Sequence, residues 1–246
     1  MNDYRLIHSP VCPIEILRLL LSIVITKNYC ITTADVNTAF LNSDIDIEIY
    51  VRIPQGINLD PNKYKLALHK AIYGLRISAK KWFEKITQVL EEAMFQQLYN
   101  EPCLFYKRCG SDIIILGIYV DDTLIIANAL YLIDELIDVF NANFRVKVDR
   151  KPSVFLGIKL YYMPDNTLQL SQESYIKQLA QLYNVGDHPE TTPMEAGLVI
   201  QKSTIHNDCR QFRGMIGALL HVARFTPPDI MAPVNLLAHQ LITKGM

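Results

Sequence analysis

Two apolar runs meet at a pair of aspartates in residues 113–127, IIILGIYVDDTLIIA. Short runs this rich in isoleucine predict two buried strands, and Asp121 and Asp122 then occupy a tight turn between them. Charge beside an apolar sheet is costly unless something binds there, and Mg²⁺, which prefers carboxylate oxygens, would relieve that cost. An ordinary β-turn, in which Asp is favoured, is the competing interpretation of the pair taken alone.

A third carboxylate comes from an upstream segment. Residues 32–36 predict another strand, and Asp35 lies near its end. If this strand runs beside the hairpin, Asp35 reaches the same metal pair as Asp121 and Asp122. Two metal ions about 3.5–4 Å apart can stabilise the attacking and leaving oxygens of an in-line phosphoryl transfer. The sequence therefore predicts a site for two Mg²⁺ ions, with Mn²⁺ as an alternative.

The other segments mix helical and strand patterns without regular βαβ order. Helices are expected over residues 14–26, 78–92, 130–141, 172–182, 211–223 and 230–241. Further strands are expected over residues 45–51, 103–107 and 154–161, and residues 186–208 are expected to be a linker. Such an order favours an α+β fold with an antiparallel sheet.

Composition narrows the class of protein. The chain has 246 residues, of which 50% are hydrophobic and 20% charged, so it can form one large domain or two smaller ones. Its five cysteines include no Cys-x-x-Cys pair, which argues against a disulfide framework or a zinc finger. The formal net charge of -1 provides no long-range attraction for a polyanion. No membrane span or secretion signal is expected, so the protein is expected to be intracellular and cytoplasmic.

Six motifs occur in a fixed order along the chain. They are DVNTAFLN (35–42), IPQG (53–56), IYGL (72–75), WF (82–83), YVDD (119–122) and FLGI (155–158). Together they resemble the copia-type LTR retrotransposon reverse transcriptase, and the likeness runs from Ser9-Pro10-Val11 to Pro228-Asp229-Ile230. The resemblance implies an RNA-directed DNA polymerase that is a fragment of a Pol polyprotein. Its reaction would be two-metal nucleotidyl transfer from a dNTP to a primer 3′-hydroxyl on an RNA or DNA template.

The resemblance also implies an architecture. This is a polymerase palm with an antiparallel sheet backed by helices, truncated fingers, a thumb-like region and a C-terminal helical tail. Partial fingers and palm would occupy residues 1–164, the thumb-like region and linker residues 165–200, and the tail residues 201–246. Other parts of a Pol polyprotein are expected partners, and an intact element would place the protein in a virus-like particle.

Roles in the reaction are implied position by position. Asp35 matches the first metal-binding aspartate, and Asp121 and Asp122 match the acidic pair of the palm hairpin. Phe40 matches the aromatic residue that lies under the incoming sugar and excludes a 2′-hydroxyl. Lys147 matches a lysine that protonates the departing pyrophosphate or contacts its charge. For Phe40 alone, a plain core aromatic is the alternative.

Binding roles follow in the same way. Tyr73 and Gly74 match the segment that lines the nucleotide and template pocket, and Arg76 lies beside them. The primer grip is matched by Phe155, Leu156, Gly157 and Ile158. A helix-entry glycine and a buried strand are the respective alternatives. The basic clusters at 76–81 and 145–151 either neutralise phosphates without reading bases or are solvated surface.

Departures from the family pattern leave a second function open. Pro13 and the segment Arg76-Ile77-Ser78-Ala79 replace residues that are usual in the family, and Arg150 stands where Gly is usual. The alternative is a catalytically inactive, degenerate retrotransposon remnant that retains the palm fold and weak nucleic-acid binding. A third possibility, an unrelated metal-dependent phosphotransferase, lacks support because the sequence contains no P-loop.

Overall fold

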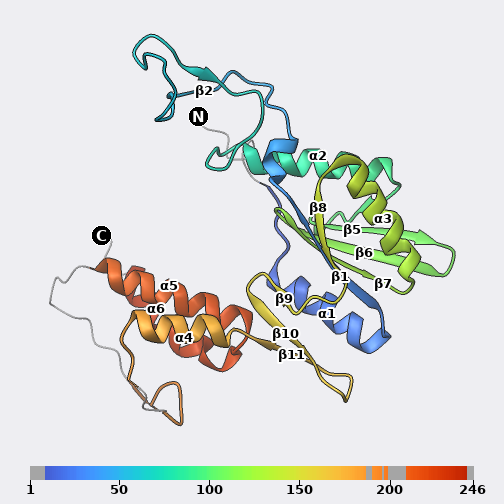
Figure 1. The fold of residues 1–246 in the computed structure, drawn as a ribbon. Coiled ribbons are helices and arrows are strands. Elements are labelled where there is room, and N and C mark those ends of the chain that lie inside the picture. Colours follow the sequence, from blue (N-terminus) through green and yellow to red (C-terminus); the bar gives the residue numbers. More distant parts are fainter. Residues whose placement is uncertain (1–8, 187–189, 196, 199–208, 243–246) are drawn as a thin grey trace. The chain divides into compact units, whose positions relative to one another are not determined.

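The structure is a computed structural model that describes residues 9–186, 190–195, 197–198 and 209–242 (Figure 1). The chain forms two compact units, Met1–Pro152 and Ser153–Met246. Both units combine helices with antiparallel strands, which confirms the expected α+β mixture. The ranges assigned above to fingers, palm, thumb-like region and tail stay predictions. The division into two compact units does not show which part of a polymerase each range forms.

A six-stranded sheet forms the frame of the first unit. Its strands are β1 (Cys30–Val36), β4 (Gln96–Gln97), β5 (Leu104–Cys109), β6 (Asp112–Tyr119), β7 (Asp122–Ala127) and β8 (Val146–Asp149). They lie in the order β4-β5-β6-β7-β1-β8, and each pairing is antiparallel. The β6–β7 hairpin and its neighbour β1 therefore have the arrangement expected from their apolar runs.

Helices cover the two faces of this sheet. One face packs on α2 (Ser78–Glu92) and α3 (Leu130–Asn143), and the other packs on α1 (Ile14–Lys27) (Figure 1). Side chains alternate between the faces along each strand, so Ile114, Leu116 and Ile118 of β6 enter the core with α2 and α3. The same core contains Trp82, Ile86, Leu90, Leu132, Leu136 and Phe140. These three helices match the apolar periodicity of the sequence.

Gly117 permits close packing between α1 and the sheet. A Cβ atom at this position would lie 3.1 Å from Cys12 Sγ and 3.3 Å from Leu20 Cδ1. Its backbone φ is not in the left-handed region that favours glycine, so space rather than conformation requires the glycine here. Gly117 thus sets how closely α1 approaches the middle of β6.

Two strand expectations need correction. The alternating segment 45–51 is wrong as a continuous strand, because only Tyr50–Val51 (β2) forms a strand, paired with Leu66–Ala67 (β3). Ile45 and Ile49 make only single backbone hydrogen bonds, to His69 and Leu68. Ile47 is 51% exposed, so the alternation there does not face a core. The expected strand 154–161 is split by a turn into β9 (Val154–Phe155) and β10 (Ile158–Tyr162). Strands β3, β4, β8 and β11 (Leu168–Ser171) were not expected.

Within the described residues, the second unit contains a small sheet and three α-helices. The sheet has the order β11-β10-β9, and the helices are α4 (Glu173–Leu182), α5 (Cys209–Phe225) and α6 (Met231–Ile242), with a short 3-10 turn, η3 (Pro228–Ile230). The Thr226 hydroxyl donates a 3.0 Å hydrogen bond to the Gln172 side-chain oxygen, which joins the end of α5 to the start of α4. The three helices confirm those expected here. The expected linker lies partly outside the described residues.

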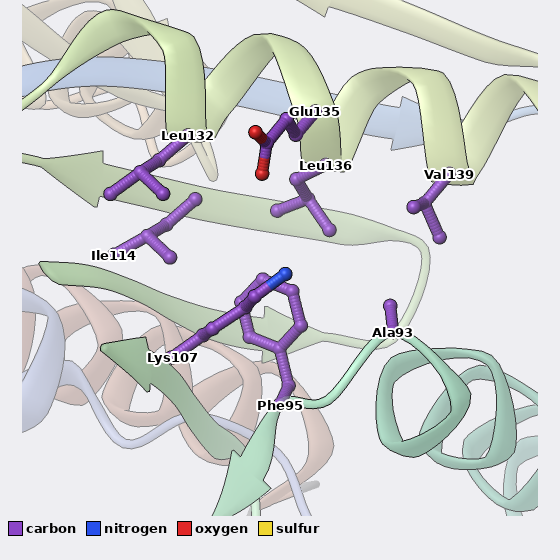
Figure 2. A pocket seen from close by; sticks show the side chains of 8 residues that line it. All are labelled: Ala93, Phe95, Lys107, Ile114, Leu132, Glu135, Leu136 and Val139. Carbon is purple, nitrogen blue, oxygen red and sulfur yellow. The ribbon is translucent and has the colours of Figure 1, made fainter. Parts of the chain in front are cut away.

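A small cavity lies between α3 and the sheet, with Phe95, Lys107, Glu135 and Leu136 among its lining residues (Figure 2). Its volume is about 20 Å³, enough for about one water molecule and far too small for a nucleotide. The cavity is a packing gap of the core. In the described part of the chain, no helix has both the length and the apolar character needed to cross a membrane.

Replacing Gly117 with valine should destabilise the first unit by about 1–3 kcal/mol, because the added side chain must displace Cys12 and Leu20 from a packed interface. Urea unfolding monitored by circular dichroism measures this change. Gly217→Ala is the control, since Gly217 lies in α5 with open space around its Cβ position and its substitution should be neutral or stabilising. Equal stability of wild type and Gly117→Val would contradict the packing role.

Candidate functional site

A row of polar side chains crosses the sheet where β6 and β7 meet. Asp35 of β1 pairs directly with Asp122 of β7 on one side and with Lys147 of β8 on the other. Asp122 in turn pairs with Tyr119 of β6. Directly paired residues place their Cβ atoms about 4.5–5.5 Å apart on the same face. The structure thus brings Asp35, Asp122 and Lys147 together from three strands.

Asp121 belongs to the turn that precedes β7. Its carbonyl oxygen accepts a 3.0 Å hydrogen bond from the backbone N–H of Val36, so the turn is joined to the end of β1. The side chains of Asp121 and Asp122 are both half-buried. The three predicted metal ligands therefore lie on adjacent strands and one turn.

The apposed carboxylates perturb one another. Burial, followed by the negative charges of Asp121 and Asp35, raises the pKa of Asp122 from 3.8 to about 6. Crowding of like charges is the condition that a bound cation relieves, and carboxylate oxygens are the ligands that hard divalent cations prefer. The donor chemistry therefore fits Mg²⁺ or Mn²⁺. As the described side chains stand, no group of three Asp, Glu, His or Cys residues is arranged to hold an ion.

The turn itself contains an unusual backbone conformation. Val120 has φ of +58°, a left-handed conformation that is a clear outlier for a β-branched residue and costs on the order of 1–3 kcal/mol. Trp82 of α2 is 1% exposed and donates a 2.6 Å hydrogen bond from its indole N–H to the Val120 carbonyl oxygen. This buried contact holds the strained turn in place. The sequence had indicated Trp82 only as part of a motif, without a role.

Tyr73 reaches the carboxylates from the loop before α2. Its hydroxyl donates a 2.8 Å hydrogen bond to Asp121 Oδ2. Partial burial, this hydrogen bond and the nearby negative charges raise the pKa of Tyr73 to about 12. The ring of Tyr73 packs on that of Phe40, with 4.3 Å between centroids. Tyr73 therefore touches both a predicted metal ligand and the predicted sugar-contacting residue.

Phe40 is more deeply placed than its partner. It lies in a short 3-10 helix, η2 (Ala39–Asn42), and is 7% exposed, whereas Tyr73 is 59% exposed. Its ring belongs to the core on the α2–α3 face of the sheet. Phe40 is thus both a core aromatic and a neighbour of the carboxylate site, and its contact with a sugar stays a prediction.

The backbone that carries Tyr73 is firmly anchored. Leu75 N–H bonds to the carbonyl oxygen of Ile72 at 3.4 Å, which closes a β-turn with Gly74 as its third residue. Gly74 has φ of +97°, a conformation that type II turns require at this place and that glycine adopts without strain. The buried Ser78 hydroxyl also donates to the Ile72 carbonyl oxygen, at 2.6 Å.

Arg76 lies apart from the carboxylate row, in an open groove of about 500 Å³ beside Lys80 and Lys81. Lys81 pairs with Asp46 at 2.9 Å and with Glu84 at 3.3 Å, and Lys80 pairs with Glu84 at 3.6 Å. Acidic neighbours therefore offset much of the lysine charge of this groove.

The predicted primer-grip residues belong to the second unit. Phe155 and Ile158 are paired across a two-residue turn and are both buried. Leu156 and Gly157 form the turn with φ of +50° and +76°. The segment forms a tight hairpin in place of the continuous strand expected over residues 154–161, and its role with a primer stays a prediction.

Comparison with known proteins identifies the family. Residues 1–196 match the family model described as "Reverse transcriptase (RNA-dependent DNA polymerase)". The chain belongs to this family.

Its relatives are Pol polyproteins of copia-type transposons. The chain is 32% identical over 243 residues to the "Retrovirus-related Pol polyprotein from transposon RE2" of Arabidopsis thaliana, covering 97% of this chain and 17% of that protein. It is 33% identical over 240 residues to the corresponding RE1 polyprotein of the same plant, covering 96% of this chain and 16% of the relative. A putative transposon Ty5-1 protein of Saccharomyces cerevisiae is 29% identical over 211 residues, covering 84% of this chain and 68% of that protein.

The match covers most of this chain but only a small part of the plant polyproteins. The chain is therefore a reverse transcriptase domain of the copia type, and by resemblance an RNA-directed DNA polymerase.

Replacing Asp122 with asparagine should stabilise the metal-free chain at neutral pH. A carboxyl group whose pKa is raised by folding destabilises the native state as pH rises from 3.8 through about 6. Because Asp122 is partly exposed, solvent screening limits the gain to roughly 1 kcal/mol above that range, and the gain should vanish near pH 4. Thermal unfolding at several pH values in EDTA measures it.

Asp46→Asn is the matched control for Asp122→Asn. Lys81 lowers the pKa of the Asp46 carboxyl, so this substitution removes a favourable interaction and should not stabilise the chain. If Asp122→Asn were no more stable than wild type at pH 7, the carboxylates would not be crowded as described.

Proposed function

We propose that this domain copies nucleic acid by two-metal nucleotidyl transfer from a dNTP to a primer 3′-hydroxyl, with Asp35, Asp121 and Asp122 as metal ligands. The direct pairing of Asp35 with Asp122, beside the turn that carries Asp121, is the observation that supports this most strongly. Bound metal ions would supply charge stabilisation to the attacking and leaving oxygens. RNA or DNA template with primer, and dNTPs, are the proposed substrates.

Lys147 is suited to act at the leaving group. It pairs with Asp35 across β1 and β8, so it projects from the same face of the sheet as the carboxylates, and its side chain is exposed. An ammonium group there can donate a proton to the departing pyrophosphate or offset its charge. Burial and then the crowded negative charge raise the pKa of Asp122, and a bound cation would offset that charge.

The aromatic pair and the glycine turn are proposed to form the nucleotide pocket. The ring of Phe40 packs against the ring of Tyr73, and the combined bulk of the two rings would limit the space for a 2′-hydroxyl on the incoming sugar. Gly74 leaves space beside the turn, since no atom lies within 4 Å of its Cβ position, so a base or sugar can approach the backbone there. Arg76 would contact phosphates, and residues 155–158 would support the primer.

A catalytically silent remnant that binds nucleic acid weakly is the second candidate. Ion pairing in the groove beside Arg76 favours it, because Lys80 and Lys81 are engaged with Glu84 and Asp46 rather than available to phosphates. This candidate predicts weak, salt-sensitive RNA binding without primer extension.

As part of an intact element, the domain would act in the cytoplasm within a virus-like particle, joined to other parts of a Pol polyprotein.

Primer extension on an RNA template with Mg²⁺ and dNTPs should be detectable, and Asp121→Asn should slow it by at least about 100-fold, because charge stabilisation by bound metal is worth several kcal/mol. Asp138→Asn, the same chemical change on the exposed side of α3, is the control and should retain wild-type extension. If the Asp121→Asn variant still extended the primer at the wild-type rate, Asp121 would not be a ligand of the catalytic metal ions. No extension by the folded chain would favour the silent remnant.

A further inference from the structure

We infer that Tyr73 is a positioning residue, whose hydroxyl orients the carboxylate of Asp121 for metal binding. The inference rests on the proposed metal site and adds a residue that acts through one of its ligands. Its basis is the 2.8 Å hydrogen bond from the Tyr73 hydroxyl to Asp121 Oδ2, made between segments far apart in the sequence.

Three separate contacts restrain Tyr73, whose hydroxyl donates the hydrogen bond to Asp121. The β-turn at Ile72–Leu75 fixes the backbone, and the Ser78 hydroxyl secures that turn from the buried start of α2. The ring then packs on Phe40, which belongs to the core and is 7% exposed. A side chain restrained at both its backbone and its ring places its hydroxyl with little freedom. The hydrogen bond is therefore preorganised by the fold.

The direction of the Asp121 side chain depends on a hydrogen-bond partner more than the directions of the Asp35 and Asp122 side chains do. Asp35 and Asp122 project from paired strands, whose ladder sets the direction of their side chains. Asp121 belongs to the turn, directly after the strained residue Val120, and lacks a strand partner. Its carboxylate direction is therefore set by the groups that contact the side chain, and the Tyr73 hydroxyl donates a hydrogen bond to it.

The hydrogen bond leaves room for a metal ion. An ionised carboxylate offers about four lone-pair sites on two oxygens, and the Tyr73 hydroxyl uses one site on Oδ2. Oδ1 and the other Oδ2 site remain for coordination. Carboxylates that ligate metals are commonly held by such hydrogen bonds, and removing the partner typically weakens metal affinity by about 10- to 100-fold. The hydroxyl thus supports the ligand rather than competing with the ion.

Tyr73→Phe tests this with the smallest possible change. It keeps the ring on Phe40 and removes only the hydroxyl. Mn²⁺ binding to the full chain, followed by the loss of the free-ion EPR signal, should show an apparent Kd about 10- to 100-fold higher than wild type. This readout does not require polymerase activity.

Tyr131→Phe is the matched control. The Tyr131 hydroxyl donates a 2.9 Å hydrogen bond to Asp112 Oδ2, at the opposite end of β6 from the YVDD turn, and the residue is 46% exposed. The Tyr131→Phe variant loses the same kind of hydrogen bond, far from the proposed metal site, and should bind Mn²⁺ as wild type does. Similar melting temperatures of the two variants would exclude a general loss of folding as the cause.

The outcomes separate this inference from the proposed function. If Asp35→Asn and Asp121→Asn lose Mn²⁺ binding while Tyr73→Phe binds as wild type, the metal site stands and the role of Tyr73 is overturned. Tighter binding by Tyr73→Phe would also overturn it, because the hydroxyl would then compete with the ion. If the aspartate variants bind Mn²⁺ as wild type does, the proposed metal site fails, and the inference fails with it.

Discussion

The direct pairing of Asp35 with Asp122 is the constraint around which the site is organised. Like charges opposite each other destabilise a sheet. Here burial, followed by the charges of Asp121 and Asp35, raises the pKa of Asp122. The register is nevertheless enforced by the rest of β1. Ala34 and Val36 are buried on the α2–α3 face, and a slip of one residue would expose them and send Asp35 into that core. Apolar packing on one face thus holds negative charge together on the other.

Support for the carboxylates comes from outside the sheet. Trp82 fixes the turn through the Val120 carbonyl oxygen, and Tyr73 fixes the Asp121 side chain, both from the loop and helix between residues 72 and 82. Strain at Val120 is tolerated because a buried donor meets its carbonyl oxygen. One local segment therefore supports both backbone and side chain at the most irregular point of the site.

Periodicity made much of the fold predictable. The α1, α2 and α3 helices and the β6–β7 hairpin bury long apolar runs, and burial on that scale leaves a pattern in the sequence. The nearness of Asp35 to Asp122 followed from placing both at strand ends. The strand predicted over residues 45–51 was wrong because only two of these residues, Tyr50 and Val51, pair with a neighbouring strand. Alternation predicts a strand only when a neighbouring strand accepts its hydrogen bonds.

Other features left no readable pattern. β8 is a four-residue strand with exposed Lys147 and Asp149, too short for a period to stand out, although it brings Lys147 beside Asp35. The Tyr73–Asp121 hydrogen bond joins a turn to a distant hairpin, and such a contact depends on tertiary structure alone. The resemblance to reverse transcriptases indicated Tyr73 as a pocket residue, but a motif does not reveal which atom its hydroxyl meets.

Strand order has a consequence for how the domain is made. β1 is the first strand of the sheet in sequence, yet it lies between β7 and β8, the last two to emerge from the ribosome. Contacts between distant segments form slowly, because the intervening loop must close first. A nascent chain holds Asp35 on an unpaired strand until the hairpin and then β8 arrive. The carboxylate row is therefore among the last features of this sheet to assemble during synthesis. A chain that stops before β8 would leave one side of β1 open to pair with another molecule.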